Sequence, residues 1–357
     1  MVNFCSDNAS GAAPEVLRAL EAANAGWAMP YGDDESTRRL EARVQEIFET
    51  QAAVFPVATG TAANVLCLSV MTPPYGAIYC HEVSHINVDE CGAPEFYTGG
   101  AKLVPLAGAH AKIEARDLET AVSGAGDVHA AQPAAVSLTN ASEAGTLYTP
   151  DEIGAISEVA KAHGLGLHLD GARFANALVA LGCSPADLTW KAGVAALSLG
   201  ATKNGVLAGE AVVLFEPGLA ETFGYRRKRG GHLFSKMRFL SAQLEAYFTD
   251  DLWLRNARHA NAMAGRLAEG MAGLPGVELS HPVESNQIFA RLPEAMIAGL
   301  FERGFEFYRW GPEANRPEDN GEVRLVTSFD TDPAHVAAFL AAVRELAAAG
   351  DDARRRA

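Results

Sequence analysis

Short apolar runs alternate with helix-like segments through the first two-thirds of the chain, and this alternation limits the fold more than any other feature. Runs this short indicate buried strands, whereas the segments between them repeat apolar residues at the spacing of a helix. The predicted helices are 13–23, 36–48, 60–71, 149–162 and 172–181, and the predicted strands are 52–57, 77–80, 103–105, 134–139, 165–170, 194–199 and 211–215. We therefore predict an α/β fold with a mostly parallel, seven-stranded sheet flanked by helices.

The pattern changes near Phe234, where a mostly helical stretch begins that extends to Gly273. A smaller alternation follows, with predicted strands 277–280, 287–292, 305–310 and 323–328 and predicted helices 294–303 and 333–349. We therefore expect a large domain over residues 1–245, which includes the N-terminal segment, and a small α+β domain over residues 246–350. The charged tail, 351–357, is expected to fray.

The chain is acidic, because 29 basic and 44 acidic side chains give it a formal net charge of −15. That balance argues against a surface for nucleic acid or anionic membranes, both of which need a basic face. The longest apolar runs fall far short of the ~20 residues of a membrane-spanning helix, and the first residues lack the basic and apolar regions of a secretory signal. Five scattered cysteines without a CxxC pair fit reduced thiols. We therefore expect a cytoplasmic protein.

An apolar strand ends at Asp170, which is followed by Gly171 and a predicted helix. In open α/β sheets, ligands bind outside the carboxyl ends of the strands, so a carboxylate at this place would face a ligand. The same aspartate could instead cap the helix that follows, whose first N–H groups need acceptors. The residues alone leave both interpretations of Asp170 open.

The next apolar strand leads into the small-residue segment Gly200-Ala201-Thr202-Lys203-Asn204-Gly205. An amine beside a buried strand end loses hydration, which lowers its pKa and makes it a nucleophile that can form a Schiff base. The alternative is an ordinary surface lysine on a turn. The segment is not a phosphate-binding P-loop, because the required spacing of glycines, lysine and hydroxyl is missing.

Two further segments suggest ligand sites. Thr59-Gly60-Thr61 joins a predicted strand to a predicted helix, whose free N–H groups and dipole would suit a phosphate, although a plain helix cap explains the segment equally well. His81-Glu82-Val83-Ser84-His85 matches the zinc motif of metalloproteases. That motif needs both histidines on one face of a helix, whereas here a predicted strand runs directly into it. We therefore expect no metal.

Together, the strand-end Asp170, the loop Lys203 and the upstream Gly/Thr segment resemble the active site of a pyridoxal-phosphate enzyme with the aspartate-aminotransferase-like fold, fold type I. More narrowly, the chain resembles the low-specificity L-threonine aldolase family of β-eliminating-type lyases. The resemblance covers nearly the whole chain through five segments, which are Phe4-Cys5-Ser6-Asp7, Tyr31-Gly32-Asp33-Asp34, Glu82-Val83-Ser84-His85, His168-Leu169-Asp170-Gly171-Ala172-Arg173 and 323–328.

This resemblance implies a set of residues for the cofactor, pyridoxal 5′-phosphate. Lys203 would hold it as a Schiff base, Asp170 would keep its ring nitrogen protonated, and His85 would stack on its ring. The phosphate would be bound by Thr59, Gly60 and Thr61, with Lys228 or Lys236 of the basic segment 226–236 reaching it across a subunit interface.

The resemblance also implies how a substrate would bind and react. Arg173 and Arg324, with Ser6, would hold its carboxylate, for which a guanidinium is well shaped, and His129 would lie near its hydroxyl. Either His85 or His129 would take the hydroxyl proton, directly or through a water. Residues 138–143 read Leu-Thr-Asn-Ala-Ser-Glu where many relatives have Glu-Asn-Thr-His, so the resemblance leaves the role of Asn140 open.

The activity that the resemblance implies is aldol cleavage of L-threonine, L-allo-threonine or a related β-hydroxy-α-amino acid such as phenylserine to glycine and an aldehyde. Another β-eliminating lyase, a transaminase or a racemase on the same fold is the first alternative, and a zinc hydrolase on His81, Glu82 and His85 is a remote one. A protein without catalytic activity is disfavoured by the presence of both Lys203 and Asp170. The implied partners are an amino-acid substrate and further copies of the chain, in a homotetramer built as a dimer of dimers.

Overall fold

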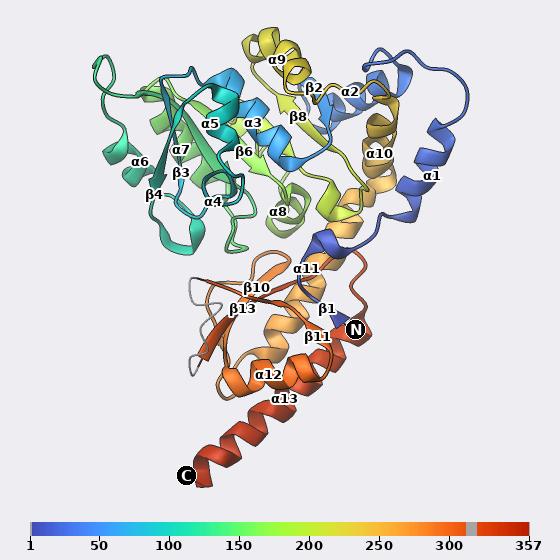
Figure 1. Cartoon of the computed structure of the whole chain (residues 1–357), viewed down its shortest axis with the longest axis vertical. Helices are drawn as coiled ribbons and strands as arrows, with labels where there is room; N and C mark the ends of the chain where they lie inside the picture. Colours follow the sequence, from blue (N-terminus) through green and yellow to red (C-terminus); the bar gives the residue numbers. More distant parts are fainter. Residues whose placement is uncertain (1, 312–319, 357) are drawn as a thin grey trace.

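A seven-stranded sheet forms the centre of the larger domain in this computed structural model, which describes residues 2–311 and 320–356 (Figure 1). Its strands lie in the order β2-β8-β7-β6-β5-β3-β4. They are β2 (Ala53–Val57), β3 (Gly76–His81), β4 (Lys102–Leu106), β5 (Gln132–Thr139), β6 (Gly166–Gly171), β7 (Ala196–Leu199) and β8 (Glu210–Leu214). Strand β8 is antiparallel to both of its neighbours, and the other strand pairs are parallel. The predicted α/β fold with a mostly parallel seven-stranded sheet is thus confirmed.

Helices cover both faces of this sheet, because alternate residues of its strands enter different apolar clusters. In β8, Ala211 and Val213 pack into the cluster that includes α1, α2, α7, α8 and α10, whereas Val212 and Leu214 pack with α3 and α9. The helices of this domain are α1 (Pro14–Ala23), α2 (Glu35–Ile47), α3 (Gly60–Met71), α4 (His85–Val88), α5 (Ala93–Thr98), α6 (Ala115–Ala121), α7 (Pro150–Ala162), α8 (Phe174–Leu181), α9 (Pro217–Arg229) and α10 (Arg238–Phe248), with the short 3-10 helices η1 (Asp7–Ala9), η2 (Ala109–Ala111), η3 (Trp190–Ala192), η4 (Thr202–Asn204) and η5 (Thr249–Asp251).

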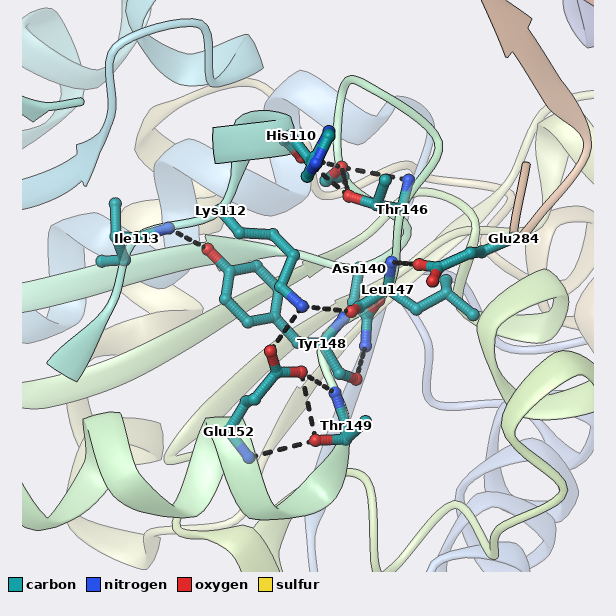
Figure 2. Close-up of polar contacts among 11 residues, drawn as sticks. His110, Lys112, Ile113, Asn140, Thr146, Leu147, Tyr148, Thr149, Glu152 and Glu284 are labelled. Carbon is teal, nitrogen blue, oxygen red and sulfur yellow. Dashed lines mark hydrogen bonds and ion pairs between the residues drawn. The ribbon is translucent and has the colours of Figure 1, made fainter. Parts of the chain in front are cut away.

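Local sequence explains where several of these helices begin and end. At the start of α7, the Thr149 hydroxyl accepts the backbone N–H of Glu152 at 3.2 Å, and the Glu152 carboxylate accepts the N–H of Thr149 at 2.8 Å (Figure 2). This reciprocal capping pairs two N–H groups that the helix itself leaves without acceptors. The basic residues 226–229 form the last turn of α9, where positive charge is favourable at the negative end of the helix dipole.

The smaller domain contains a four-stranded antiparallel sheet in the order β12-β13-β10-β9. Its elements are β9 (Glu278–Leu279), β10 (Gln287–Pro293), β11 (Phe305–Glu306), β12 (Tyr308–Arg309), β13 (Asn320–Val326), α12 (Glu294–Glu302) and α13 (Pro333–Arg356). Helix α13 continues into the charged tail that we expected to fray, in a stretch rich in alanine and arginine, both strong helix formers.

The N-terminal segment packs on the smaller domain, whereas we expected it to belong to the large one. Strand β1 (Val2–Asn3) pairs in parallel with β11, and the buried Phe4 ring contacts the ring of Phe339 at 5.3 Å between centroids. An apolar residue this close to the chain start gains more by entering an existing core than by staying exposed. Figure 1 accordingly shows the N-terminus at the lower domain.

One long helix, α11 (Leu252–Met271), belongs to both domains (Figure 1). Its first half, with Trp253 and Ala257, packs into the core of the larger domain, and its second half, with Ala264 and Leu267, packs into that of the smaller one. The two domains are therefore joined by a continuous rigid element, and a boundary at residues 245/246 stays a prediction. Within residues 2–311 and 320–356, no helix has both the length and the apolar character that crossing a membrane demands.

Candidate active site

A cavity of about 290 Å³ lies at the carboxyl ends of β5, β6 and β7, beside the N-terminus of α3. This is the edge of an open α/β sheet at which ligands bind. The structure brings most of the predicted site residues to its wall, namely Thr59, Gly60, Thr61, His85, Asp170, Arg173 and Lys203. These residues come from different strands and loops, so only the folded sheet places them around one space.

Asp170 lies in β6 with its side chain buried, and both of its carboxylate oxygens are engaged. Oδ1 accepts the backbone N–H of Ala172 at 2.9 Å, and Oδ2 accepts the side-chain amide of Asn64 at 2.8 Å. The cap residue of the following helix, α8, is Arg173 instead. The helix-cap interpretation of Asp170 is therefore wrong, and its carboxylate is held in one orientation at the cavity.

Asn64 also connects Asp170 to His85. Its amide nitrogen donates a second hydrogen bond, at 2.8 Å, to Glu90 Oε1, and the same oxygen contacts Nδ1 of His85 at 2.8 Å. The hydrogen bond to Glu90 raises the pKa of His85, which favours the charged imidazolium. A continuous hydrogen-bonded row thus links the strand-end carboxylate to the imidazole.

Lys203 lies in η4, directly after β7, and its amine is partly buried at the cavity wall. Burial and the nearby charge of Arg173 lower the pKa of Lys203, so a larger fraction of the amine is neutral and nucleophilic. Glu210 of β8 lines the same cavity and accepts the backbone N–H of Ala201 at 2.6 Å. Burial raises the pKa of Glu210 to about 7.

Thr59 caps α3, because its hydroxyl oxygen accepts the N–H of Ala62 at 3.1 Å. The N–H groups of the first turn, at Gly60 and Thr61, lie where the helix dipole favours an anion. The cap and the anion site are compatible, since one hydroxyl satisfies only one of the N–H groups that a helix start leaves free.

Arg173 lines the cavity but already has an acidic partner. Its guanidinium donates from Nε to Oδ2 of Asp7 at 2.8 Å and from Nη2 to Oδ1 at 3.0 Å. Burial by itself would raise the pKa of Asp7, but the charges of Arg173 and Lys203 outweigh it and hold that pKa below its usual range. The pair fixes the guanidinium at the edge of the cavity.

Arg324 and Ser6 lie near this pair and do not line the cavity. The Arg324 guanidinium lies 4.1 Å from the ring centroid of Trp310 and 5.4 Å from that of Tyr308, and it donates to the Cys5 carbonyl at 3.2 Å. The Ser6 side chain accepts the N–H of Asn8 and so caps η1. Burial and the charge of Arg173 lower the pKa of Arg324.

Lys228 and Lys236 are exposed in this chain and lie outside the cavity wall. The Lys228 ammonium stands 4.7 Å from the ring centroid of Tyr31, which is itself half-exposed. A contact of either lysine with a phosphate stays a prediction that would require a neighbouring subunit.

His129 is not brought to the cavity. It is exposed on the loop before β5, where its backbone N–H donates to Asp127, whereas the cavity lies beyond the other end of that strand. A strand of this length separates its ends by more than roughly 20 Å at about 3.3 Å per residue. The structure therefore gives no support, within one chain, to a contact of His129 with the substrate hydroxyl.

The two histidines of the zinc-like motif lie in different elements. His81 is the last residue of β3 and bonds to the Gly108 carbonyl at 3.0 Å, whereas His85 begins α4. Across residues 2–311 and 320–356, no three His, Cys, Asp or Glu side chains gather as metal ligands. The helical geometry that a zinc hydrolase would need is absent from this segment.

Sequence reasoning missed several polar residues of the site, and Glu210 is one of them. Asp7, Asn64 and Glu90 hold Arg173, Asp170 and His85, respectively, and Glu143 lines the cavity with a half-buried side chain. Asn64 could have been found, because it lies one turn into the helix that Thr59 caps. Arg173, the partner of Asp7, and His85, one partner of Glu143, are distant in sequence, so no local pattern marks these contacts.

Comparisons with known proteins agree with one another. The family model of the beta-eliminating lyases matches residues 3–295. Two proteins named low specificity L-threonine aldolase, from Pseudomonas sp. and Pseudomonas aeruginosa, are 43% and 45% identical to this chain, over 97% and 96% of it and 98% and 95% of their own lengths. A solved structure of a threonine aldolase from Leishmania major superposes with a TM-score of 0.91 at 30% identity, covering 97% of this chain and all of that one.

Proposed function

Since this chain belongs to the beta-eliminating lyase family and is a pyridoxal 5′-phosphate-dependent lyase, we propose that it cleaves L-threonine and related β-hydroxy-α-amino acids to glycine and an aldehyde. L-allo-threonine and phenylserine are the related substrates that we propose. The observation that carries the proposal is the placement of Asp170 and Lys203 on the wall of one cavity, in a chain similar over nearly its full length to threonine aldolases.

The residues at the cavity fit the cofactor. Lys203 offers a partly buried amine of lowered pKa, and Asp170 offers a carboxylate held by Asn64 and the N–H of Ala172. When bound, pyridoxal 5′-phosphate supplies an aldehyde that reacts with amines and a ring that accepts the electrons of a bond broken at Cα. Asp170 would hold the proton of the ring nitrogen, and the start of α3 at Thr59, Gly60 and Thr61 would bind the phosphate.

The substrate would be oriented through its carboxylate. Arg173 would supply a guanidinium at the cavity wall and Arg324 a second one from outside it, and they are held by Asp7 and by Trp310, respectively. A carboxylate clamped at a fixed point limits rotation of the substrate, so the bond to be broken keeps a productive orientation. Ser6 lies beside these groups and would contribute a hydroxyl.

His85 would lie against the cofactor ring rather than act as the base. Its hydrogen bond to Glu90 raises its pKa, which favours the charged form, and its Nδ1 is engaged with that carboxylate. A charged imidazolium is a poor proton acceptor, whereas its planar ring suits stacking.

The test is a product assay on the purified holoenzyme with threonine, allo-threonine and phenylserine, after an absorption spectrum. We expect a yellow protein that forms glycine and the matching aldehyde, and borohydride should attach the cofactor to Lys203. Lys203→Ala should be colourless and inactive, whereas Lys191→Ala, changed at an exposed lysine whose amine pairs with Glu49, should behave as wild type. Ammonia and a keto acid in place of glycine would overturn the proposal in favour of another reaction of this fold.

We also propose that the enzyme works as a homotetramer in the cytoplasm. Trp27, Met29 and Tyr31 are exposed on the loop after α1, which would suit contact with another copy of the chain. The five cysteines form no disulfide, which suits a reducing compartment. Light scattering during gel filtration measures the mass, and a monomer would contradict the assembly.

A further inference from the structure

The loop that joins β5 to α7, residues 140–149, carries a carboxylate into the cavity at Glu143. This loop is fixed by polar contacts at its base. The Asn140 side chain donates to the Tyr148 carbonyl at 2.9 Å and accepts the Tyr148 N–H at 3.2 Å, which closes the loop on itself (Figure 2). These contacts give Asn140 a role that sequence comparison left open.

Two neighbours hold the same loop from outside. The Lys112 amine donates to the Leu147 carbonyl at 2.7 Å, and Glu284, from the smaller domain, accepts the Leu147 N–H at 2.7 Å (Figure 2). Both domains thus contribute to the position of the loop. Glu143 is therefore presented on a rigid support, as a group that acts on a substrate requires.

Only one oxygen of the Glu143 carboxyl group is used by the protein. Oε1 accepts the backbone N–H of His85 at 2.9 Å and the hydroxyl of Thr139 at 3.0 Å. Oε2 is buried and has no hydrogen-bond partner in residues 2–311 and 320–356. A purely structural role, capping the start of α4 at His85, explains Oε1 and leaves Oε2 unexplained, and a buried oxygen without a partner is costly.

The surroundings of Glu143 suit proton transfer. Burial, and then the charge of Asp170, raise the pKa of Glu143 to about 7. A carboxyl group with such a pKa exists in both protonation states at neutral pH, which is the condition for an efficient acid–base group. The groups that face it are Asp170, His85 and Thr139, and Nδ1 of His85 is already engaged by Glu90, whereas Oε2 of Glu143 has no partner among the described residues.

We propose that Glu143 is the catalytic residue that takes the β-hydroxyl proton of the substrate, a role that rests on the proposed function. The O–H bond breaks, its proton goes to the Glu143 carboxylate, and its electron pair becomes the second C–O bond of the aldehyde. The Cα–Cβ bond breaks with its electron pair left on the Cα side, and a proton from solvent later takes the place of Cβ in glycine. Glu143 then returns its proton to solvent, so atoms and charges balance.

The test compares Glu143→Gln with the wild-type holoenzyme. Glutamine keeps an oxygen for the His85 N–H and the Thr139 hydroxyl but cannot accept the proton. We expect kcat for threonine cleavage to fall on the order of 10²- to 10⁴-fold. The plot of kcat against pH should also lose its ascending limb near neutral pH. The absorption spectrum and the exchange of the glycine Cα hydrogen with deuterated water, which involves no hydroxyl, should stay near wild type.

Wild-type cleavage rates and pH profile retained in Glu143→Gln would overturn the inference and leave the proposed function intact. Failure of the wild type to form glycine from threonine would instead overturn the proposed function. Equal losses of cleavage and glycine exchange would assign Glu143 a merely structural role.

Infrared titration gives a readout that does not depend on turnover. The infrared carbonyl band of protonated Glu143 should appear as the pH falls through neutral and disappear as it rises. This change should occur in the wild type and also in Glu210→Gln, which serves as the control because the pKa of Glu210 is raised to a similar value. The Glu143→Gln variant should lack the part of the carbonyl band that changes near neutral pH. If Glu143→Gln does not fold, absence of the band from Glu210→Gln decides against the proposal.

Discussion

Asp7 and Arg173 form a two-point ion pair, with hydrogen bonds of 2.8 and 3.0 Å, although they lie 166 residues apart in the chain. The Asp7 side chain is 1% exposed and that of Arg173 is 12% exposed. Asn286, from the smaller domain, donates to the same carboxylate at 3.0 Å. The guanidinium that we propose as a substrate anchor is thus already oriented by the N-terminal segment, and this contact couples the cavity to both domains.

Replacing Asp7 by asparagine should destabilise the fold and loosen substrate binding. The change leaves the Arg173 charge without its partner in a buried setting, which costs on the order of 3 kcal/mol. We expect a matching fall in the free energy of unfolding in urea, and a higher KM for threonine. As a control, Glu46→Gln breaks the exposed pair with Arg43 and should cost less than about 1 kcal/mol. Equal costs for the two variants would contradict the buried-pair interpretation.

The same pair predicts a pH dependence. The pKa of Asp7 is depressed in the folded state, so its stabilisation is present above the unfolded pKa of about 3.9 and is lost as the pH falls through the folded value. The stability difference between wild type and Asp7→Asn should therefore be full at neutral pH and shrink only below about pH 4. A stability difference between the two proteins that shrinks between pH 7 and pH 5 would contradict a depressed pKa of Asp7.

Replacing Asn64 by alanine should weaken cofactor binding. The variant removes one donor from Asp170 and one from Glu90, and a hydrogen bond to a charged group contributes about 1.5–3 kcal/mol. We expect the dissociation constant of pyridoxal 5′-phosphate to rise by about tenfold or more, measured by titrating apoenzyme and following absorbance. The matched variant Asn261→Ala removes an amide that bonds to Asn176, away from the cavity, and should keep wild-type affinity.

His168 should make the protein less stable in mild acid. Its ring lies buried between the hydroxyls of Ser137 and Ser198, both at 2.9 Å, and burial lowers the pKa of His168 to about 4. In the unfolded chain, His168 binds a proton below about pH 6.5, whereas in the folded chain it stays neutral down to about pH 4. Acid therefore favours unfolding between these two pH values. His168→Gln should remove up to about 3 kcal/mol of this loss, measured as the difference in unfolding free energy from wild type at several pH values. If the unfolding free energies of wild type and His168→Gln changed in parallel between pH 6.5 and pH 4, the expectation would be contradicted.

Removing the ring beneath Arg324 should raise KM more than it lowers kcat. The guanidinium lies 4.1 Å from the Trp310 centroid, and such a contact contributes about 0.5–2 kcal/mol. In Trp310→Leu the anchor loses part of its support, so we expect KM for threonine to rise several-fold with a smaller change in kcat. Tyr75→Leu, at an exposed aromatic residue, is the control and should change neither. A fall in kcat alone would mean that Trp310 does not act through the substrate anchor.

Local patterns were sufficient for much of the sheet and for the capping of α7. The apolar runs were long enough to mark each strand, and Thr149 and Glu152 lie three residues apart, so their reciprocal bonds follow from helix geometry. The direction of β8 could not be predicted in this way, because whether a strand runs parallel or antiparallel depends on the path of the chain between strands.

The sequence by itself determined that Asp170 and Lys203 follow successive apolar strands, and the structure then showed that these strands are parallel neighbours whose carboxyl ends lie at one edge of the sheet. Only the tertiary structure decided that His129 lies at the opposite end of β5, that Phe4 packs on the smaller domain, and that Glu143 reaches His85 across 58 residues. The reason is physical: strand ends follow from short-range hydrophobic patterning, whereas these contacts depend on loop paths and domain packing, which no nearby residues encode.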